Sequence, residues 1–340
     1  MKVINLVIIS AFICGVFTGC NKEDGNNVNV ANVYVAGQSG KSAVLWKNGV
    51  VQDLTGTLLK SEGASSEYSE VAISVFISGK DVYVAGVRIS EDGESIAVLW
   101  KNGVAQYLSD ESSFAKSVFV SGSDVYVAGA VGNIATLWKN GKVHNLTDGI
   151  NTSGRAESVY VSGGDVYVAG IEFLPGLKYF AKLWKNGELQ NLIDNEDGSA
   201  LSVFVSGGDV YVAGYRWNYI WDSSGVPVAT LWKNGEPQNL SDETNSGDAI
   251  SVCISGNDVY VAGRCGKGPV LWKNGEMQNL ELEGDLGWTT SVYVSGSDVY
   301  VTGFDVIGFG DGIAKLWKNG KAQNLTDGTD KANAYSVFVK

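Results

Sequence analysis

Histidine, proline and methionine are scarce in this chain of 340 residues, which contains 1 His, 4 Pro and 2 Met. The single histidine, His144, excludes a His-rich metal site and leaves little basis for a Ser-His-Asp triad. Basic residues are few, with 25 Lys and Arg against 37 Asp and Glu, and the net charge is −12. That balance argues against nucleic-acid binding, which needs a basic surface. The 44% hydrophobic content still permits a large core and excludes a wholly disordered chain.

The N-terminus has the features of an export signal. Met1-Lys2 is followed by an apolar run from Val3 to Phe17 and then by Thr18-Gly19-Cys20. The last four residues resemble a bacterial lipobox, and this resemblance implies cleavage before Cys20 and acylation of Cys20, with palmitate among the acyl groups. We therefore expect a signal peptide at residues 1–19 and a lipidated Cys20 that begins a flexible polar tether over residues 20–31. An ordinary signal peptide with an incidental cysteine is the alternative.

The residues after Cys20 bear on the cellular location. Lys22-Glu23-Asp24 resembles the Lys-acid-acid tag that directs some lipoproteins to the outer face of the outer membrane. This resemblance implies a lipid-anchored protein of the bacterial cell envelope, in the outer membrane and exposed at the cell surface. An ordinary solvated linker is the alternative. We expect a monomer that contacts the membrane through its lipid anchor only.

Two of the four cysteines belong to the expected folded part of the mature chain. Cys14 lies in the signal peptide and Cys20 is the lipidation site. Cys253 and Cys265 lie on successive predicted strands, but several residues out of register, which is farther apart than a disulfide can reach. We therefore expect two free thiols.

Three short motifs recur along the rest of the chain and predict a repeat architecture. Leu-Trp-Lys-Asn-Gly and Val-Tyr-Val-Ala/Thr-Gly each occur seven times. Ser-Val-(Phe/Tyr/Cys)-(Val/Ile)-Ser-Gly occurs six times, and a seventh copy is cut short at Lys340. The tryptophans of the first motif are Trp46, Trp100, Trp138, Trp184, Trp232, Trp272 and Trp317.

Each repeat unit predicts four short antiparallel strands, labelled A to D, because β-branched and aromatic residues dominate. Strand A is the Ser-Val motif, strand B is the Val-Tyr-Val motif, and strand C ends in Leu-Trp-Lys. Asn-Gly then predicts a type I′ turn into a short strand D. Strands A to C are apolar at successive positions, so neighbouring sheets must cover both faces of each sheet. The polar alternation of a β-sandwich and the periodicity of an α-solenoid are both missing.

These repeats resemble seven-bladed β-propellers over residues 32–340, with one four-stranded antiparallel blade for each unit. The first unit, residues 32–55, starts with a strand B, whereas residues 336–339 form a strand A with no partner after it. The resemblance therefore implies an all-β ring in which strand 336–339 joins the blade of residues 32–55. The motifs do not match those of the WD40, Kelch or Asp-box subfamilies.

The two ends of the blades differ in sequence. The A–B and C–D turns share one end, here the turn face, and they are nearly identical in every unit. The Asp before each strand B is expected to cap backbone N–H groups in its turn. The B–C and D–A connections share the other end, here the loop face, where they vary and where the D–A connectors are rich in acids. We expect ligand recognition at the acidic loop face and a tether that reaches the turn face.

Aromatic residues in the variable connections are the candidate ligand-binding residues, because exposed aromatics often mark glycan or protein contacts. A connection folded onto its own aromatics is the alternative. The strand-C tryptophans are expected to pack between blades, and His144 occupies a strand-D position that is Gln in other units. The candidates are Tyr179 and Phe180 in the fourth B–C connection, Tyr215, Trp217, Tyr219 and Trp221 in the fifth, and Trp288 in a D–A connector.

These features favour a lipid-anchored envelope protein that binds a glycan, peptide or protein through its loop face. A carboxylate-based carbohydrate-active enzyme and an envelope assembly scaffold are the alternatives, and no residue is assigned a catalytic role. No cofactor is expected. Calcium is kept as an alternative at residues 194–198 and 242–248, which supply oxygen ligands but match no EF-hand loop.

Overall fold

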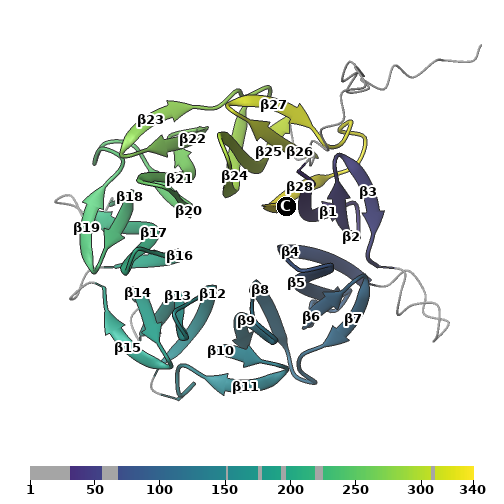
Figure 1. Ribbon diagram of the computed structural model, residues 1–340, viewed down its shortest axis with the longest axis vertical. Helices are drawn as coiled ribbons and strands as arrows, with labels where there is room; N and C mark the ends of the chain where they lie inside the picture. The colour runs from purple at the N-terminus through teal and green to yellow at the C-terminus, as the bar shows by residue number, and fades with distance from the viewer. Residues whose placement is uncertain are drawn as a thin grey trace, which may run out of the picture. The chain divides into compact units, whose positions relative to one another are not determined.

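The computed structural model describes residues 31–55, 68–150, 152–174, 178–192, 197–218, 225–307 and 311–340. The unit from Asn32 to Lys340 forms seven four-stranded antiparallel sheets that follow one another around a ring (Figure 1). The chain is thus a seven-bladed β-propeller, as the repeats predict. The described residues form no helix long and apolar enough to cross a membrane. The expected signal peptide, Cys20 and residues 21–30 of the tether lie outside the described residues.

Strand A of each blade is innermost and strand D outermost (Figure 1). Blade 1 combines β28 (Ala332–Val339), β1 (Val33–Ser39), β2 (Ser42–Lys47) and β3 (Val50–Asp53). Blade 2 consists of β4 (Tyr68–Ser78), β5 (Asp81–Ser90), β6 (Ser95–Lys101) and β7 (Val104–Tyr107). Blade 3 consists of β8 (Ser113–Ser121), β9 (Asp124–Val131), β10 (Ile134–Lys139) and β11 (Lys142–Asn145). Blade 4 consists of β12 (Ser153–Ser162), β13 (Asp165–Leu174), β14 (Lys178–Lys185) and β15 (Glu188–Asn191). Blade 5 consists of β16 (Gly198–Ser206), β17 (Asp209–Asn218), β18 (Val226–Lys233) and β19 (Glu236–Asn239). Blade 6 consists of β20 (Gly247–Ser255), β21 (Asp258–Cys265), β22 (Gly268–Lys273) and β23 (Glu276–Asn279). Blade 7 consists of β24 (Leu286–Ser295), β25 (Asp298–Ile307), β26 (Asp311–Lys318) and β27 (Lys321–Asn324).

The C-terminal strand closes the ring as predicted. Strand β28 pairs antiparallel with β1, with Val337 opposite Val35 and Val339 opposite Val33. The strand begins at Ala332, earlier than the predicted residue 336, because the pairing continues past a register shift opposite Ala36 and Gly37. Blade 1 is therefore built from both ends of the propeller.

The apolar side chains gather in seven cores, each shared by two neighbouring blades. Trp100 of blade 2, for example, packs with Ala36 and Leu45 of blade 1. The seven strand-C tryptophans are at most 2% exposed, which confirms that they pack between blades. The glycine of the Val-Tyr-Val-Ala-Gly motif makes room for them: a Cβ on Gly86 would overlap the Val71 carbonyl oxygen and lie 3.0 Å from Cζ3 of Trp100.

A belt of hydrogen bonds connects the inner strands around the ring. The serine of each strand A accepts, through its Oγ, a hydrogen bond from the backbone N–H of a valine in the next blade, at 3.1 to 3.4 Å. Ser74 accepts from Val118, and Ser117 accepts from Val159. All seven blade junctions have this bond, so the Ser-Val motif joins sheets that share no strand pairing.

Aromatic rings line the inner strands two residues after these serines. Successive rings lie with their centroids 4.6 to 5.0 Å apart, from Tyr293 through Phe338, Phe76, Phe119 and Tyr160 to Phe204. In blade 6 the equivalent residue is Cys253, which is buried and has a free thiol. Cys265 is also free, and its strand partner is Gly247 whereas the partner of Cys253 is Tyr260. Both thiols are therefore free as expected.

The turn face is organised by a repeated side-chain network. In blade 2, Oδ1 of Asp81 accepts a hydrogen bond from Nδ2 of Asn102 at 2.8 Å, and Oδ2 of Asp81 lies 3.2 Å from Nζ of Lys101. The N–H of Val82 donates to Oδ1 of Asn102. The repeated Asp was expected to cap backbone N–H groups, but the N–H of Val82 is capped by Asn102 and not by Asp81. The Asn of the Asn-Gly turn accepts from the backbone, and the Asp joins the A–B turn to the C–D turn.

Candidate functional site

The five candidate aromatic residues that the structure describes lie on strands and not in loops, which corrects the prediction for them. In blade 4 the B–C pairing extends to Leu174 opposite Lys178, so Tyr179 and Phe180 belong to β14. In blade 5 the pairing extends to Asn218 opposite Val226 and includes Tyr215 and Trp217 in β17. The backbone ladder continues past the repeated glycine because aromatic residues there, such as Phe173, Tyr215 and Trp217, favour strands.

Trp288 also lies on a strand. It was expected in a D–A connector, but it belongs to β24 and pairs with Phe304 of β25. Strand A in this blade extends toward the loop face before the Ser-Val motif, as it does in the other blades. Tyr219 and Trp221 lie outside the described residues. The role of all seven candidates in ligand binding stays a prediction.

One pair of strand positions near the loop face differs from blade to blade. The first position is the residue after the repeated glycine of strand B, and the second is its partner on strand A. Blades 4 to 7 place charged or large aromatic side chains there more often than blades 1 to 3. With the strand A residue first, the pairs are Asn333/Gln38 in blade 1, Val71/Val87 in blade 2, Phe114/Ala130 in blade 3 and Arg155/Ile171 in blade 4. They are Ser199/Tyr215 in blade 5, Asp248/Arg264 in blade 6 and Trp288/Phe304 in blade 7.

A cation–π contact connects an ion pair of blade 6 with two stacked rings of blade 7 at these positions. Nη2 of Arg264 donates a hydrogen bond to Oδ2 of Asp248 at 2.8 Å. The Arg264 guanidinium also lies 5.8 Å from the centre of the Trp288 ring, within the range of a cation–π contact. Trp288 stacks on Phe304 with the centroids 5.4 Å apart and an interplanar angle of 23°. The guanidinium, the carboxylate and the indole are therefore held in fixed relative positions.

Tyr215 of blade 5 continues this group. Its ring meets that of Trp217 edge to face, with the centroids 6.4 Å apart. Burial raises the pKa of the Tyr215 hydroxyl, and the Asp248 carboxylate raises this pKa further. The hydroxyl is therefore protonated at neutral pH and can donate a hydrogen bond. We name Arg155, Tyr215, Asp248, Arg264, Trp288 and Phe304 the rim cluster.

Arg155 connects the rim cluster to the aromatic residues of blade 4. Its guanidinium lies 5.1 Å from the centre of the Phe173 ring, and the Phe173 ring meets that of Tyr179 edge to face at 5.4 Å. Nε of Arg155 lies 3.5 Å from Oε1 of Glu157, and Nζ of Lys116 lies 3.8 Å from Oε2 of the same carboxylate. The structure thus brings Tyr179 together with Phe173, whose place in the sequence gives no sign of this contact.

Phe180 lies on a neighbouring position of the same hairpin, opposite Glu172. Nζ of Lys182 lies 5.6 Å from the centre of the Phe180 ring and 2.9 Å from a carboxylate oxygen of Glu172. Alternate residues of a strand point to opposite sides, so Tyr179 and Phe180 serve opposite sides of the hairpin. The two candidates of blade 4 therefore do not form one surface.

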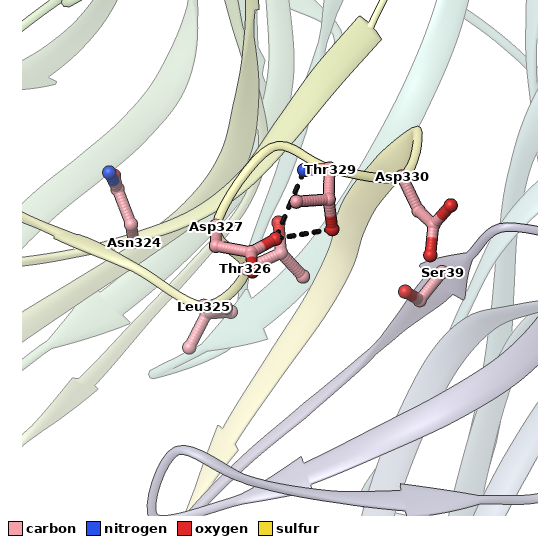
Figure 2. Close-up of a pocket in the computed structure, with 7 residues that line it drawn as sticks. All are labelled: Ser39, Asn324, Leu325, Thr326, Asp327, Thr329 and Asp330. Carbon is pink, nitrogen blue, oxygen red and sulfur yellow. Dashed lines mark hydrogen bonds between the residues drawn. The ribbon is translucent and has the colours of Figure 1, made fainter. Parts of the chain in front are cut away.

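Acidic residues of the D–A connectors accept hydrogen bonds from residues of the same turn. Oδ1 of Asp327 accepts hydrogen bonds from the backbone N–H of Thr329 at 3.0 Å and from its hydroxyl at 2.7 Å (Figure 2). The Thr329 hydroxyl lowers the pKa of Asp327. Asp242 makes the same bonds with Thr244. The acidity of this face therefore comes partly from residues with a structural role.

A cavity of about 440 Å³ lies beside this turn in blade 7 and reaches Ser39 of blade 1 (Figure 2). Asp327, Asp330 and hydroxyl groups line it. In the part of the chain that the structure describes, no three His, Cys, Asp or Glu side chains meet as a metal site would require. Residues 242–248 are described and residues 194–196 are not. His144 lies exposed on β11 opposite Leu137, as Gln106 lies opposite Leu99.

Glu70 bears on the alternative of a carboxylate enzyme, because it is the one described carboxyl group with a raised pKa. Burial raises this pKa against the opposing effect of Arg88, whose Nε donates to Oε1 of Glu70 at 2.6 Å. The Arg88 guanidinium in turn lies 5.2 Å and 5.1 Å from the ring centres of Tyr68 and Tyr107. Glu70 is only 1% exposed, so a substrate cannot reach it as it would a general acid.

No family model matches this chain, and no curated protein matches it. Among solved structures, the β-propeller domain of the trilobed protease from Pyrococcus furiosus, which has an open velcro topology, is 14% identical with a TM-score of 0.52, over 89% of this chain and 98% of that chain. The periplasmic gluconolactonase of Pseudomonas aeruginosa is 12% identical with a TM-score of 0.46, over 91% and 98% of the two chains. The first likeness supports the β-propeller fold, and at such identities it says nothing of an activity.

Proposed function

We propose that this protein is a binding protein of the bacterial cell envelope that takes its ligand at the rim cluster. One observation supports this most. At positions defined by the repeat, blades 1 to 3 carry mostly apolar or amide side chains, whereas blades 4 to 7 carry Arg155, Tyr215, Asp248, Arg264 and Trp288. The repeat fold does not need these side chains at those positions, because the other blades fold without them. A ligand provides a reason for them.

The chemistry of the cluster fits a glycan best among the ligands that the sequence suggests. A sugar ring offers an apolar face of C–H groups and a rim of hydroxyls. The partly exposed Trp288 ring suits the apolar face, and the paired Arg264 and Asp248 can donate to and accept from hydroxyl groups. Because the ion pair and the ring stack already exist in the free protein, little side-chain entropy would be lost on binding.

The sequence supports the proposals of a lipid anchor at Cys20 and of a location in the outer membrane. A tether that enters the propeller at Asn32 arrives on the turn face, because Asn32 exchanges backbone hydrogen bonds with Lys340 at the end of strand A. The loop face with the rim cluster would then point away from the membrane. This arrangement suits a protein that captures polysaccharide, peptide or protein outside the bilayer.

The test is a binding screen of the mature, acyl-free chain against a panel of polysaccharides, with the release of reducing ends recorded in the same samples. Binding should weaken at least tenfold in Trp288→Ala and in Arg264→Ala, and stay within twofold in Phe114→Ala. Phe114 occupies the position of Trp288 in blade 3 and is likewise partly exposed, so it controls for the loss of a ring.

Equal weakening in Phe114→Ala and Trp288→Ala would contradict a ligand site at the rim cluster. Release of reducing ends by the unmodified chain would instead identify a carbohydrate-active enzyme. A panel that includes acidic, neutral and amino sugars covers both signs of charge that the cluster presents.

A further inference from the structure

The turn face carries an uneven distribution of side chains that the repeat itself does not require. The residue directly after each Asn-Gly turn is exposed in every blade. In blades 1 and 2 it is Val50, 67% exposed, and Val104, 65% exposed. In blades 3 and 7 it is a lysine, and in blades 4 to 6 it is a glutamate. The charged residues are Lys142, Lys321, Glu188, Glu236 and Glu276.

Two further lysines add positive charge to the arc that contains the valines. Lys80 is exposed in the A–B turn of blade 2. Lys47 of blade 1 lacks the carboxylate that its equivalents have: in the other six blades the strand-C lysine lies 2.7 to 3.2 Å from an Asp oxygen. Blade 1 has Asn32 at that position, and Asn48 donates to its Oδ1. In this arc Asp81, Asp124 and Asp298 pair with Lys101, Lys139 and Lys318, so the further lysines give the arc more lysines than acids.

These residues belong to four consecutive blades, in the order 7, 1, 2, 3 (Figure 1). A Cβ on Gly49 of blade 1 would lie 3.6 Å from Nε2 of Gln323 in blade 7. A Cβ on Gly141 of blade 3 would lie 3.6 Å from Nε2 of Gln106 in blade 2. Blades 1 and 2 share a core that contains Leu45 and Trp100. We name Lys47, Val50, Lys80, Val104, Lys142 and Lys321 the Val–Lys patch.

We propose that the Val–Lys patch docks the propeller directly onto an anionic lipid bilayer. Lysines near a negatively charged leaflet each add to the attraction, and exposed valines at turn tips can enter the headgroup region. The three glutamates of blades 4 to 6 would be repelled by the same surface, so the propeller would meet the bilayer with blades 1 and 2 foremost. This contact is separate from a lipid anchor, and it does not depend on what the rim cluster binds.

The docking surface sets an orientation that a flexible tether cannot set alone. Asn32 lies in blade 1 close to the patch, because it accepts a hydrogen bond from Asn48, which lies between Lys47 and Val50 in the chain. A tether that enters there would hold the patch close to the bilayer, and the patch would hold the loop face outward. The proposed contact would be a second membrane contact beside the expected lipid anchor.

The experiment measures co-sedimentation of the mature, acyl-free chain with vesicles of phosphatidylethanolamine and phosphatidylglycerol, and with vesicles of phosphatidylcholine alone. The unmodified chain should pellet with the anionic vesicles, and binding should fall as salt rises from 50 to 500 mM. Lys80→Glu/Lys142→Glu/Lys321→Glu should weaken binding at least tenfold. Val50→Ser/Val104→Ser should weaken it about threefold or more, with less dependence on salt.

The matched control is Lys41→Glu/Lys267→Glu/Lys331→Glu, which makes the same change in net charge with exposed lysines of the loop face. This variant should bind as the unmodified chain does. Equal losses in the two triple variants would show an effect of net charge alone and overturn the proposal, as would failure of the unmodified chain to bind anionic vesicles. All the substituted positions are exposed or at turns, and thermal melts confirm that each variant is folded.

Discussion

Ser336 accepts a hydrogen bond from the backbone N–H of Val75 at 3.2 Å, although 261 positions separate the two residues in the chain. This bond joins blade 1 to blade 2 across the closure of the ring. It belongs to the same belt that connects every other pair of neighbouring blades. The last residues of the chain therefore complete a sheet and a circle of contacts at once.

Deleting residues 335–340 should open the ring. The deletion removes most of the pairing partner of β1 and leaves an unpaired strand edge in blade 1, and such edges promote aggregation. We expect a melting temperature more than about 10 °C lower and soluble aggregates in size-exclusion chromatography. Removing Lys340 alone is the control and should change the melting temperature by no more than a few degrees. An unchanged melting curve after the longer deletion would contradict the closed ring.

The buried ion pair of blade 7 should show strong coupling between its two members. Nζ of Lys315 lies 2.8 Å from Oδ2 of Asp305, and both side chains are 0% exposed. Lys315→Val or Asp305→Val alone should lower the free energy of unfolding by about 3–5 kcal/mol. The first leaves the buried Asp305 carboxylate without its cation, and the second leaves the buried Lys315 with only the half-exposed Glu283 carboxylate. The double variant should recover most of the loss. Valine is the matched choice because Val98 and Val131 occupy these positions in blades 2 and 3.

Urea unfolding of the four proteins, including the unmodified chain, measures this coupling. Additive losses in the double variant would show that the two charges act independently. Glu283, whose carboxylate lies 2.9 Å from Nζ of Lys315, remains in all four proteins.

The two thiols should differ in reactivity and in their effect on stability. Burial raises the pKa of Cys253 from 9.0 to about 11, and Cys253 is 6% exposed. Cys265 is partly exposed, although burial and the Asp242 carboxylate also raise its pKa. A maleimide at pH 8 should therefore label Cys265 first and Cys253 at least tenfold more slowly.

The sign of the pH effect follows from the raised pKa. The folded state holds the Cys253 proton more tightly than the unfolded state, so its contribution to stability is complete below about pH 9 and is lost as the pH rises through about 11. In a chain that begins after Cys20, the Cys265→Ser variant isolates Cys253 for both measurements. Equal labelling rates for the two thiols in the unmodified chain would contradict the buried position of Cys253.

The fold could be predicted because each blade repeats the same short strands. The recurrence of Trp100 and its equivalents in apolar strands predicted the packing between blades, and the displaced strand A at the C-terminus predicted the closure with β1. The spacing of Cys253 and Cys265 predicted free thiols. These conclusions need only local strand geometry and the count of repeats.

The contacts between neighbouring blades could not be predicted in the same way. Ser74 and Val118 meet only because two sheets pack at a particular height along the axis, and no single motif encodes that height. Asp248 and Arg264 are ordinary surface charges in the sequence, and only the strand register places them opposite each other. Aligning the blades position by position would have revealed the rim cluster, because its side chains depart from those of the other units.

Some predictions remain predictions. Cys20, Tyr219 and Trp221 lie outside the described residues. The loop-face acids illustrate a different limit, because the sequence counts Asp242 and Asp327 as free charge, whereas the structure shows each engaged in its own turn. A count of charges cannot separate these two uses.

The seven Asn-Gly turns have a chemical consequence. Asn-Gly is the dipeptide most prone to lose ammonia through a cyclic imide, since glycine offers no side chain to obstruct the attack of its nitrogen on the Asn amide. In every blade the amide is held at both ends: its oxygen accepts from a backbone N–H, as in Asn102 with Val82, and its nitrogen donates to a side-chain oxygen. Folding thus slows the deamidation of these seven asparagines, and in an unfolded chain they would be the first to deamidate.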